Sequence, residues 1–197
     1  MKNPRIERIL EISKELGLSH IGSCISVLPI LEEIYAKKKS EDLVIFDNAH
    51  AHLAHLIIKE SEGELDFVHI GTAEDYIKKY GIHCDRKAGC DASGGSLGHG
   101  IGISIGFALA NPKRAVHCVV SDGSMMEGSN WEALRIINDL QLHQIHIYCN
   151  FNGYTAVSEY NTKLLAIRMG TFTSHFTIYE TDNGEGFSGV QGHYKKL

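Results

Sequence analysis

Two apolar, strand-like runs that each end in a polar side chain constrain the fold of this chain most. Residues 115–120 lead into Asp122-Gly123, and residues 145–149 lead into Asn152, thirty positions after Asp122. If both runs are parallel strands, their carboxyl ends meet at the edge where open α/β sheets bind ligands. Carboxylate and amide oxygens suit Mg²⁺ or Ca²⁺, and Mg²⁺ commonly takes its other ligands from phosphates and water. The pattern therefore indicates a metal-bridged diphosphate.

The rest of the chain alternates between helical and strand-like patterns. Helical periodicity, with caps and glycine stops, predicts helices over residues 5–16, 25–35, 50–59, 72–79, 97–110 and about 129–140. A further strand is predicted over residues 176–180. This alternation predicts an α/β fold with a doubly wound, mainly parallel sheet and helices on both faces. The length fits a single domain over residues 1–197.

Composition argues against several functions. The net charge of −5 disfavours a nucleic-acid binder, which usually has a basic surface. The five cysteines include no CxxC pair, and Cys118 and Cys149 are expected to be buried thiols. This cysteine usage predicts a reducing compartment, the cytoplasm. His50, His52 and His55 do not share one helix face, so a zinc site made of these three is not expected. Neither a membrane-spanning segment nor a signal peptide is expected.

The two strand ends resemble the thiamine diphosphate signature of the transketolase family, which reads Gly-Asp-Gly, about thirty residues, then Asn. Four further segments resemble the family's Ser-Gly-His-Pro-Gly, Asn-Gly-His-Gly, His-Pro-Asp-Arg and Thr-Gly-Ser-Leu-Gly-Gln-Gly motifs. In the family's order, they are residues 19–23, 48–51, 83–86 and 94–100. Residues 184–188 and 192–193 resemble the end of the same cofactor domain. The ordered set is specific, whereas each piece alone is a weak signal.

The resemblance implies that the chain binds thiamine diphosphate through Mg²⁺, for which Ca²⁺ is a possible substitute. Asp122 and Asn152 would supply side-chain oxygens to the metal, and Tyr154 its backbone carbonyl. Gly123 would let the backbone approach the diphosphate and donate its amide. Asn150 remains an alternative to Asn152 as the ligand. Plain Asp-Gly and Asn-Gly turns are the structural alternative for both pairs.

The resemblance also implies which residues surround cofactor and substrate. Histidines suit proton transfer near neutral pH and can neutralise phosphate or hydroxyketone oxygens. The family's motif positions give such catalytic roles to His20, His50, His83 and His193, and place His50 at the cofactor as well. Glu127 matches a catalytic-network glutamate near the family's subunit interface, although an acid favouring a helix N-terminus is an equal alternative. Gly95, Ser96 and Leu97 would form a backbone wall beside the cofactor.

Several positions depart from the family pattern but leave the expected Mg²⁺ ligands intact. Ser121 replaces the first glycine of the signature, and Ala49 and Ala51 replace glycines of the Asn-Gly-His-Gly motif. His99 replaces a glutamine, and Cys84 replaces a proline.

The chain is also shorter than the family pattern, with forty-five residues after Asn152. No segment of this sequence resembles the family's other half, which carries the pyrimidine-binding domain and the glutamate that activates the cofactor ring. The resemblance therefore implies a split enzyme, in which this N-terminal subunit pairs with a separate C-terminal subunit in a homodimer or heterotetramer.

The leading functional hypothesis is a transferase subunit that moves a two-carbon ketol unit between sugar phosphates and is active only with its partner. Two alternatives stay open. One is another thiamine diphosphate enzyme, of the 2-oxoacid decarboxylase or synthase type, and the other is a non-catalytic, truncated binding module.

Overall fold

The computed structural model of the chain describes residues 3–66, 68–155, 158–187, 191–192 and 194–197. Among these residues, four parallel strands form one sheet in the order β1-β2-β3-β4. The strands are β1 (Leu43–Phe46), β2 (Val116–Ser121), β3 (Ile145–Phe151) and β4 (Phe176–Glu180). Ser121 pairs with Asn150 in the register, so β2 and β3 end side by side.

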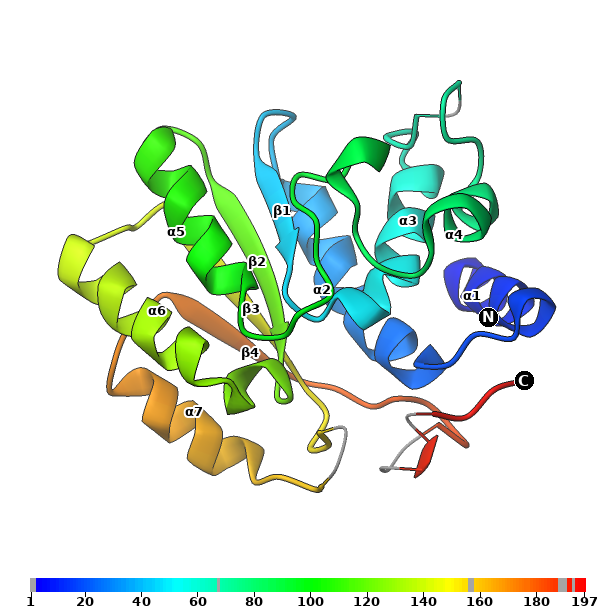
Figure 1. The fold of residues 1–197 in the computed structure, drawn as a ribbon. Coiled ribbons are helices and arrows are strands. Elements are labelled where there is room, and N and C mark those ends of the chain that lie inside the picture. The colour runs from blue at the N-terminus through cyan, green and yellow to red at the C-terminus, as the bar shows by residue number, and fades with distance from the viewer. Residues whose placement is uncertain (1–2, 67, 156–157, 188–190, 193) are drawn as a thin grey trace.

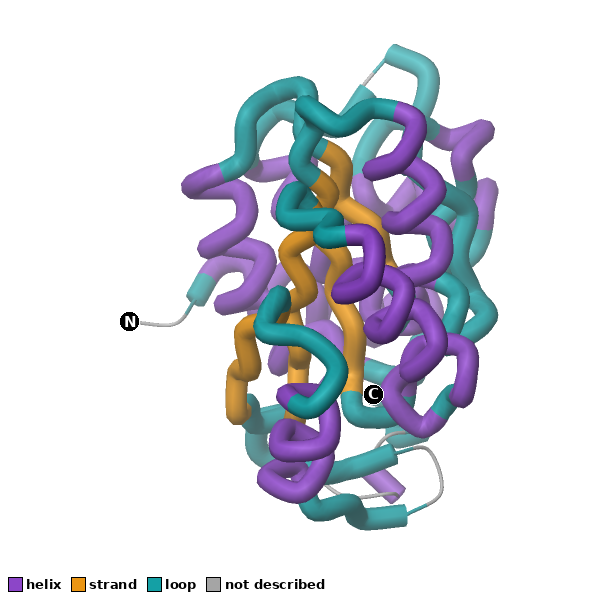
Figure 2. Tube along the Cα trace, turned by 90° about the vertical axis from the view of Figure 1, so that its left-hand side faces the viewer, coloured by secondary structure: helices purple, strands orange, loops and turns teal. Residues whose placement is uncertain are grey.

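Helices cover both faces of the sheet, as Figures 1 and 2 show. One layer contains α1 (Pro4–Leu16), α2 (Ile21–Lys37), α3 (His52–Ser61) and α4 (Ala73–Tyr80). The other contains α5 (Gly100–Ala110), α6 (Gly128–Leu140) and α7 (Thr162–Gly170). Short 3₁₀ turns are η1 (Ala49–Ala51), η2 (Arg86–Ala88) and η3 (Ser124–Met126). The predicted α/β fold with helices on both faces is confirmed. The strand order β1-β2-β3-β4 does not reverse, so the connecting helices α5, α6 and α7 lie on one face and the N-terminal helices cover the other.

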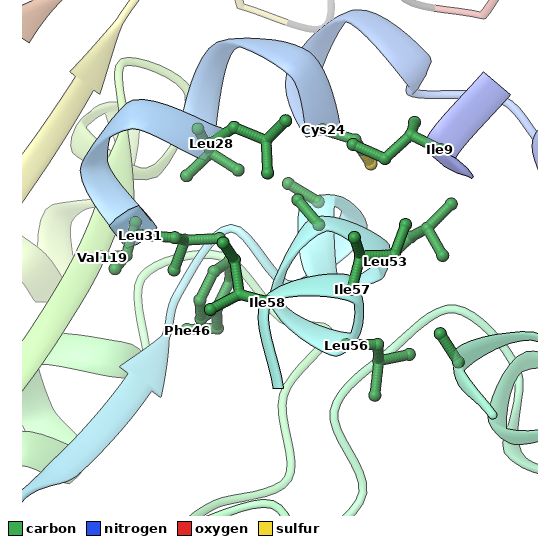
Figure 3. Close-up of a cluster of buried hydrophobic side chains, with 14 of the residues drawn as sticks. Ile9, Cys24, Leu28, Leu31, Phe46, Leu53, Leu56, Ile57, Ile58 and Val119 are labelled. Carbon is green, nitrogen blue, oxygen red and sulfur yellow. The ribbon is translucent and has the colours of Figure 1, made fainter. Parts of the chain in front are cut away.

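Two hydrophobic cores lie on opposite faces of the sheet because successive strand residues point to opposite sides. Val119 of β2 packs with the α1–α4 layer, whereas its neighbours Cys118 and Val120 pack with α5 and α6. Figure 3 shows Leu28 and Leu31 of α2 in the first core, together with Phe46, Val119 and residues of α3. Cys118 and Cys149 are fully buried, as predicted. No helix in the described part of the chain is both long and apolar enough to cross a membrane.

Local sequence signals set several helix ends. Asn3 accepts a hydrogen bond from the amide of Arg5 at the start of α1, and Gly17 ends that helix in the left-handed conformation. Thr72 and Asp75 form a reciprocal capping box at α4. The sequence did not predict α7, which follows Asn161 in a region of weak periodicity.

Candidate functional site

A cavity of about 320 Å³ lies at the carboxyl ends of β2 and β3, where the α1–α4 layer meets the sheet edge. Its lining contains nine of the residues that the sequence predicted for the site: His20, His50, His83, Gly95, Leu97, Asp122, Gly123, Asn152 and Tyr154. The lining also contains residues that the sequence did not assign to the site, namely Ser23, Ile82, Thr155 and Tyr194. The topology thus gathers residues from positions 20 to 194 around one space.

A larger cavity of about 670 Å³ lies elsewhere, between the start of α1 and helices α2 and α3. Arg5 in its lining is already paired with Glu32 (2.9 Å) and Glu62 (2.6 Å). This larger cavity lies away from the carboxyl ends of the strands, where sheets of this kind bind ligands. The smaller cavity is therefore the candidate site.

Asp122 and Asn152 are held together by the turn that follows β3. The amides of Asn152 and Gly153 donate to Asp122 Oδ2 at 3.1 and 2.8 Å. The Asn152 side chain accepts from the amide of Tyr154 at 3.0 Å and donates to Asn183 Oδ1 at 3.0 Å. Asp122 and Asn152 therefore line one cavity at two adjacent strand ends, and backbone hydrogen bonds fix the position of each side chain.

The environment of Asp122 suits a bound cation. Its side chain is only 1% exposed. Burial raises the pKa of its carboxyl to about 6, although the amides of Gly153 and Asn152 oppose that rise. A divalent cation beside a carboxylate favours the ionised form, so it would remove the penalty that burial imposes. The donor set fits a hard metal such as Mg²⁺.

Asn150 was the alternative ligand, and its side chain is engaged at both ends. Its Nδ2 donates to Ser26 Oγ of α2 at 3.0 Å, and its Oδ1 accepts from Thr181 Oγ1 at 2.5 Å. These bonds link β3 to α2 and to the residue after β4. The Asn152 side chain is also engaged at both ends, by Tyr154 and Asn183, but the amide of Asn152 donates to Asp122 Oδ2. This contact with Asp122, rather than a free side chain, favours Asn152 over Asn150 as the candidate ligand.

The predicted histidines come from separate elements and face the same cavity. His20 has a left-handed backbone with φ of 64° at the start of α2, and its ring lies 5.1 Å from that of His50. Ser19 Oγ lies 2.8 Å from His20 Nδ1. Burial, together with nearby His52, lowers the pKa of His83. The left-handed backbone of His20 is a strained conformation, and such strain is common where function requires a fixed side chain. The fourth histidine, His193, lies outside the described residues.

Asp47 organises the glycine-rich wall and was missed by the sequence analysis. It directly follows β1, is 1% exposed, and accepts hydrogen bonds from the amides of Gly98 (3.0 Å) and Gly100 (2.6 Å). Gly98 has φ of 88°, so the helix predicted from residue 97 begins only at Gly100. The apolar run 43–46, which was not predicted as a strand, was the available signal, because Asp47 follows it as Asp122 follows β2.

Two predicted residues lie outside the lining of the main cavity. Ser96 lines a neighbouring cavity of about 180 Å³ together with His99. Glu127 is exposed immediately before α6 and packs against Gly98, where an added Cβ would approach the Glu127 Cβ to 2.6 Å. The structure therefore places both beside the glycine-rich wall.

Known proteins share this architecture. A family model described as 1-deoxy-D-xylulose-5-phosphate synthase matches residues 5–177. The structure of transketolase from Leishmania mexicana superposes with a TM-score of 0.67 at 18% identity, over 84% of this chain and 30% of that chain. The fold is thus that of the N-terminal domain of transketolases. The chain belongs to the transketolase and 1-deoxy-D-xylulose-5-phosphate synthase family, as its N-terminal cofactor domain.

Two curated relatives are subunits by name. The 6-deoxy-6-sulfo-D-fructose transketolase subunit SqwG of Clostridium sp. (strain MSTE9) is 25% identical over 167 residues, covering 74% of this chain and 61% of the relative. An apulose-4-phosphate transketolase subunit of Actinobacillus succinogenes is 26% identical over 138 residues, covering 58% of this chain and 47% of the relative. The chain thus matches about half to three fifths of the length of these relatives.

Proposed function

We propose that this chain is the Mg²⁺- and thiamine diphosphate-binding subunit of a transketolase-like enzyme. With a separate C-terminal subunit, it would transfer a two-carbon ketol unit between sugar phosphates. One observation carries the proposal: Asp122 and Asn152 converge at the ends of adjacent parallel strands, in the cavity that His20, His50 and His83 also line.

Three residues would hold the metal. Asp122 and Asn152 offer side-chain oxygens, and Tyr154 offers its backbone carbonyl. The amide of Gly123 can donate to a diphosphate oxygen, and this glycine lies in the same lining. These are few protein ligands, as is usual for Mg²⁺ bound to phosphates.

The histidines would orient the substrate and move its protons. The chemistry that thiamine diphosphate supplies when bound is an electron sink for making and breaking carbon–carbon bonds beside a carbonyl. His83, with its lowered pKa, is neutral at pH 7 and can accept a proton from a substrate hydroxyl. His20 and His50, with ring centroids 5.1 Å apart, can hold the hydroxyl and carbonyl oxygens of a sugar.

The names of the relatives support a partner subunit. SqwG and the apulose-4-phosphate enzyme chain are both named as subunits of transketolases. In the transketolase family the pyrimidine-binding domain completes the site. A separate chain that carries this domain would therefore complete the cofactor site of this protein.

A synthase reaction is the second candidate, because the family model that matches is described as 1-deoxy-D-xylulose-5-phosphate synthase. Such an enzyme would condense a 2-oxoacid with an aldehyde and release carbon dioxide. Product analysis with the partner present separates the two reactions, because ketol transfer consumes a ketose donor and releases no carbon dioxide.

Titration calorimetry of thiamine diphosphate tests the proposal. The titration is made with and without Mg²⁺, using the chain with and without a C-terminal transketolase subunit from the same organism. We expect binding that requires both Mg²⁺ and the partner, and that is lost in Asp122→Ala. Absence of binding under every condition would leave a non-catalytic binding module instead.

Alanine substitution should mainly reduce stability at Asn150 and mainly weaken Mg²⁺-dependent binding at Asn152. Asn150→Ala removes two buried hydrogen bonds and should lower the free energy of unfolding by about 2–3 kcal/mol, with Mg²⁺-dependent binding retained. Asn152→Ala should lower the free energy of unfolding by about 1 kcal/mol and weaken that binding at least about tenfold. Urea denaturation and calorimetry measure the two effects. The reverse pattern would make Asn150 the ligand.

A further inference from the structure

Three metal-ligating side chains meet in the α1–α4 layer, apart from the proposed Mg²⁺ ligands. They are His52 at the start of α3, and Cys84 and Cys90 on either side of η2. One ligand atom from each lies within 4.8 Å of the others. His52 is fully buried, Cys84 is 7% exposed, and Cys90 is half-buried. No sequence motif indicates this cluster, because thirty-eight positions separate His52 from Cys90.

The distance between His52 and Cys90 suits a tetrahedral zinc site. His52 Nε2 lies 3.5 Å from Cys90 Sγ. Zinc bonds to sulfur and imidazole nitrogen of the usual lengths place tetrahedral ligands roughly 3.5–3.8 Å apart. A water molecule can complete the tetrahedron, because the Tyr76 hydroxyl already donates to the carbonyl of His83 (3.1 Å) and accepts from the amide of Asp85 (2.8 Å).

The charges suit a buried cation as well. Cys90 Sγ lies 3.5 Å from His52 Nε2 and 3.4 Å from the Tyr76 hydroxyl, and polar neighbours of this kind favour the thiolate form that binds metal. Zinc displaces the remaining proton from a coordinating thiol such as Cys84. Two thiolates and a neutral imidazole then give a complex with no net charge, which an apolar core can hold at low cost.

We propose that His52, Cys84 and Cys90 bind a structural Zn²⁺ ion. The ion would join α3 to the loop that carries His83 and Gly95 of the candidate site. Cys84 directly follows His83, and its carbonyl accepts a hydrogen bond from the amide of Gly94 at 3.0 Å. A zinc ion here would fix the loop to α3 at two points, Cys84 and Cys90. The proposal rests on this cluster alone and is independent of the proposed function.

Metal analysis of the purified, tag-free chain, expressed with zinc and dialysed against metal-free buffer, tests this. We expect about one Zn²⁺ per chain, the stoichiometry of a single structural site. Cys84→Ser and Cys90→Ser should each reduce the zinc content at least about tenfold, because a thiolate ligand is lost. Cys118→Ser is the matched control, since it removes a buried thiol from the other core and should retain the zinc.

Cobalt substitution of the unaltered chain keeps the test independent of variants that fold poorly. Co²⁺ at this site should give an intense sulfur-to-metal charge-transfer band and the visible bands of a tetrahedral ion. Absence of zinc together with absence of these bands would overturn the proposal. Zinc that persists in the Cys84→Ser, Cys90→Ser double variant would do so too. A metal-free chain lighter by two hydrogens, with Cys84 and Cys90 found in one disulfide-linked peptide pair, would equally overturn it.

Discussion

Replacing Asp122 by asparagine should stabilise the metal-free protein above pH 6 and remove its Mg²⁺-dependent binding of thiamine diphosphate. Burial holds the pKa of this carboxyl at about 6, against an ordinary value of 3.8. Because the folded-state pKa is the higher one, the wild-type protein loses stability as the pH rises from about 4 through about 6. That difference in pKa corresponds to about 3 kcal/mol, which asparagine does not lose because it does not ionise.

Urea denaturation at pH 5 and pH 8, in chelator and in Mg²⁺, measures this effect. In chelator at pH 8 the Asp122→Asn protein should be more stable than wild type by up to about 3 kcal/mol, and at pH 5 by less. With the partner subunit, the same variant should bind Mg²⁺–thiamine diphosphate at least about a hundredfold more weakly, a loss of about 2.7 kcal/mol. If the free energy of unfolding depended on pH equally in the two proteins, the raised pKa of Asp122 would be ruled out.

Gly100→Ala should destabilise the protein severely, because the start of α5 lies against β1. A Cβ at this position would lie 2.6 Å from the Asp47 Cβ and 2.9 Å from its Cα. The backbone must therefore move, and with it the two amides that Asp47 holds. We expect a loss of about 3 kcal/mol or more in the free energy of unfolding, measured by urea denaturation.

Gly102→Ala is the matched control for this effect. Gly102 lies in the same helix and is exposed, and a Cβ added there would meet no atom within 4 Å. Alanine there should raise stability by about 0.5–1 kcal/mol, because glycine is unfavourable inside a helix. If both variants lost the same stability, the contact with Asp47 would not be the cause of the loss at Gly100.

The sequence predicted much of the fold, because its local signals agree with the tertiary structure. The strand at 176–180 matches β4, and Thr72 caps α4 as expected. Gly98 shows where local signals fail. A glycine-rich apolar run is typical of a helix from residue 97, but Asp47, some fifty residues away, binds the amides and delays the helix to Gly100.

The candidate site also combines residues that the sequence predicted with contacts that only the folded structure shows. The strand-like runs predicted Asp122 and Asn152, because a strand end places the residues that follow it at the sheet edge. The histidines were predicted only through their resemblance to family motifs. Motifs alone could not separate Asn152 from Asn150, since that depends on Ser26 and Thr181, which approach only in the folded chain.

Local patterns in the chain were enough to predict the class of fold, the order of most helices and strands, and the residues that meet at the ends of β2 and β3. Three features emerged only on folding: the buried role of Asp47, the engagement of Asn150, and the meeting of His52 with Cys84 and Cys90. The physical reason is range. Periodicity, caps and strand ends act over a few residues, whereas a buried carboxylate or a metal-ligating cluster depends on segments that only packing brings together.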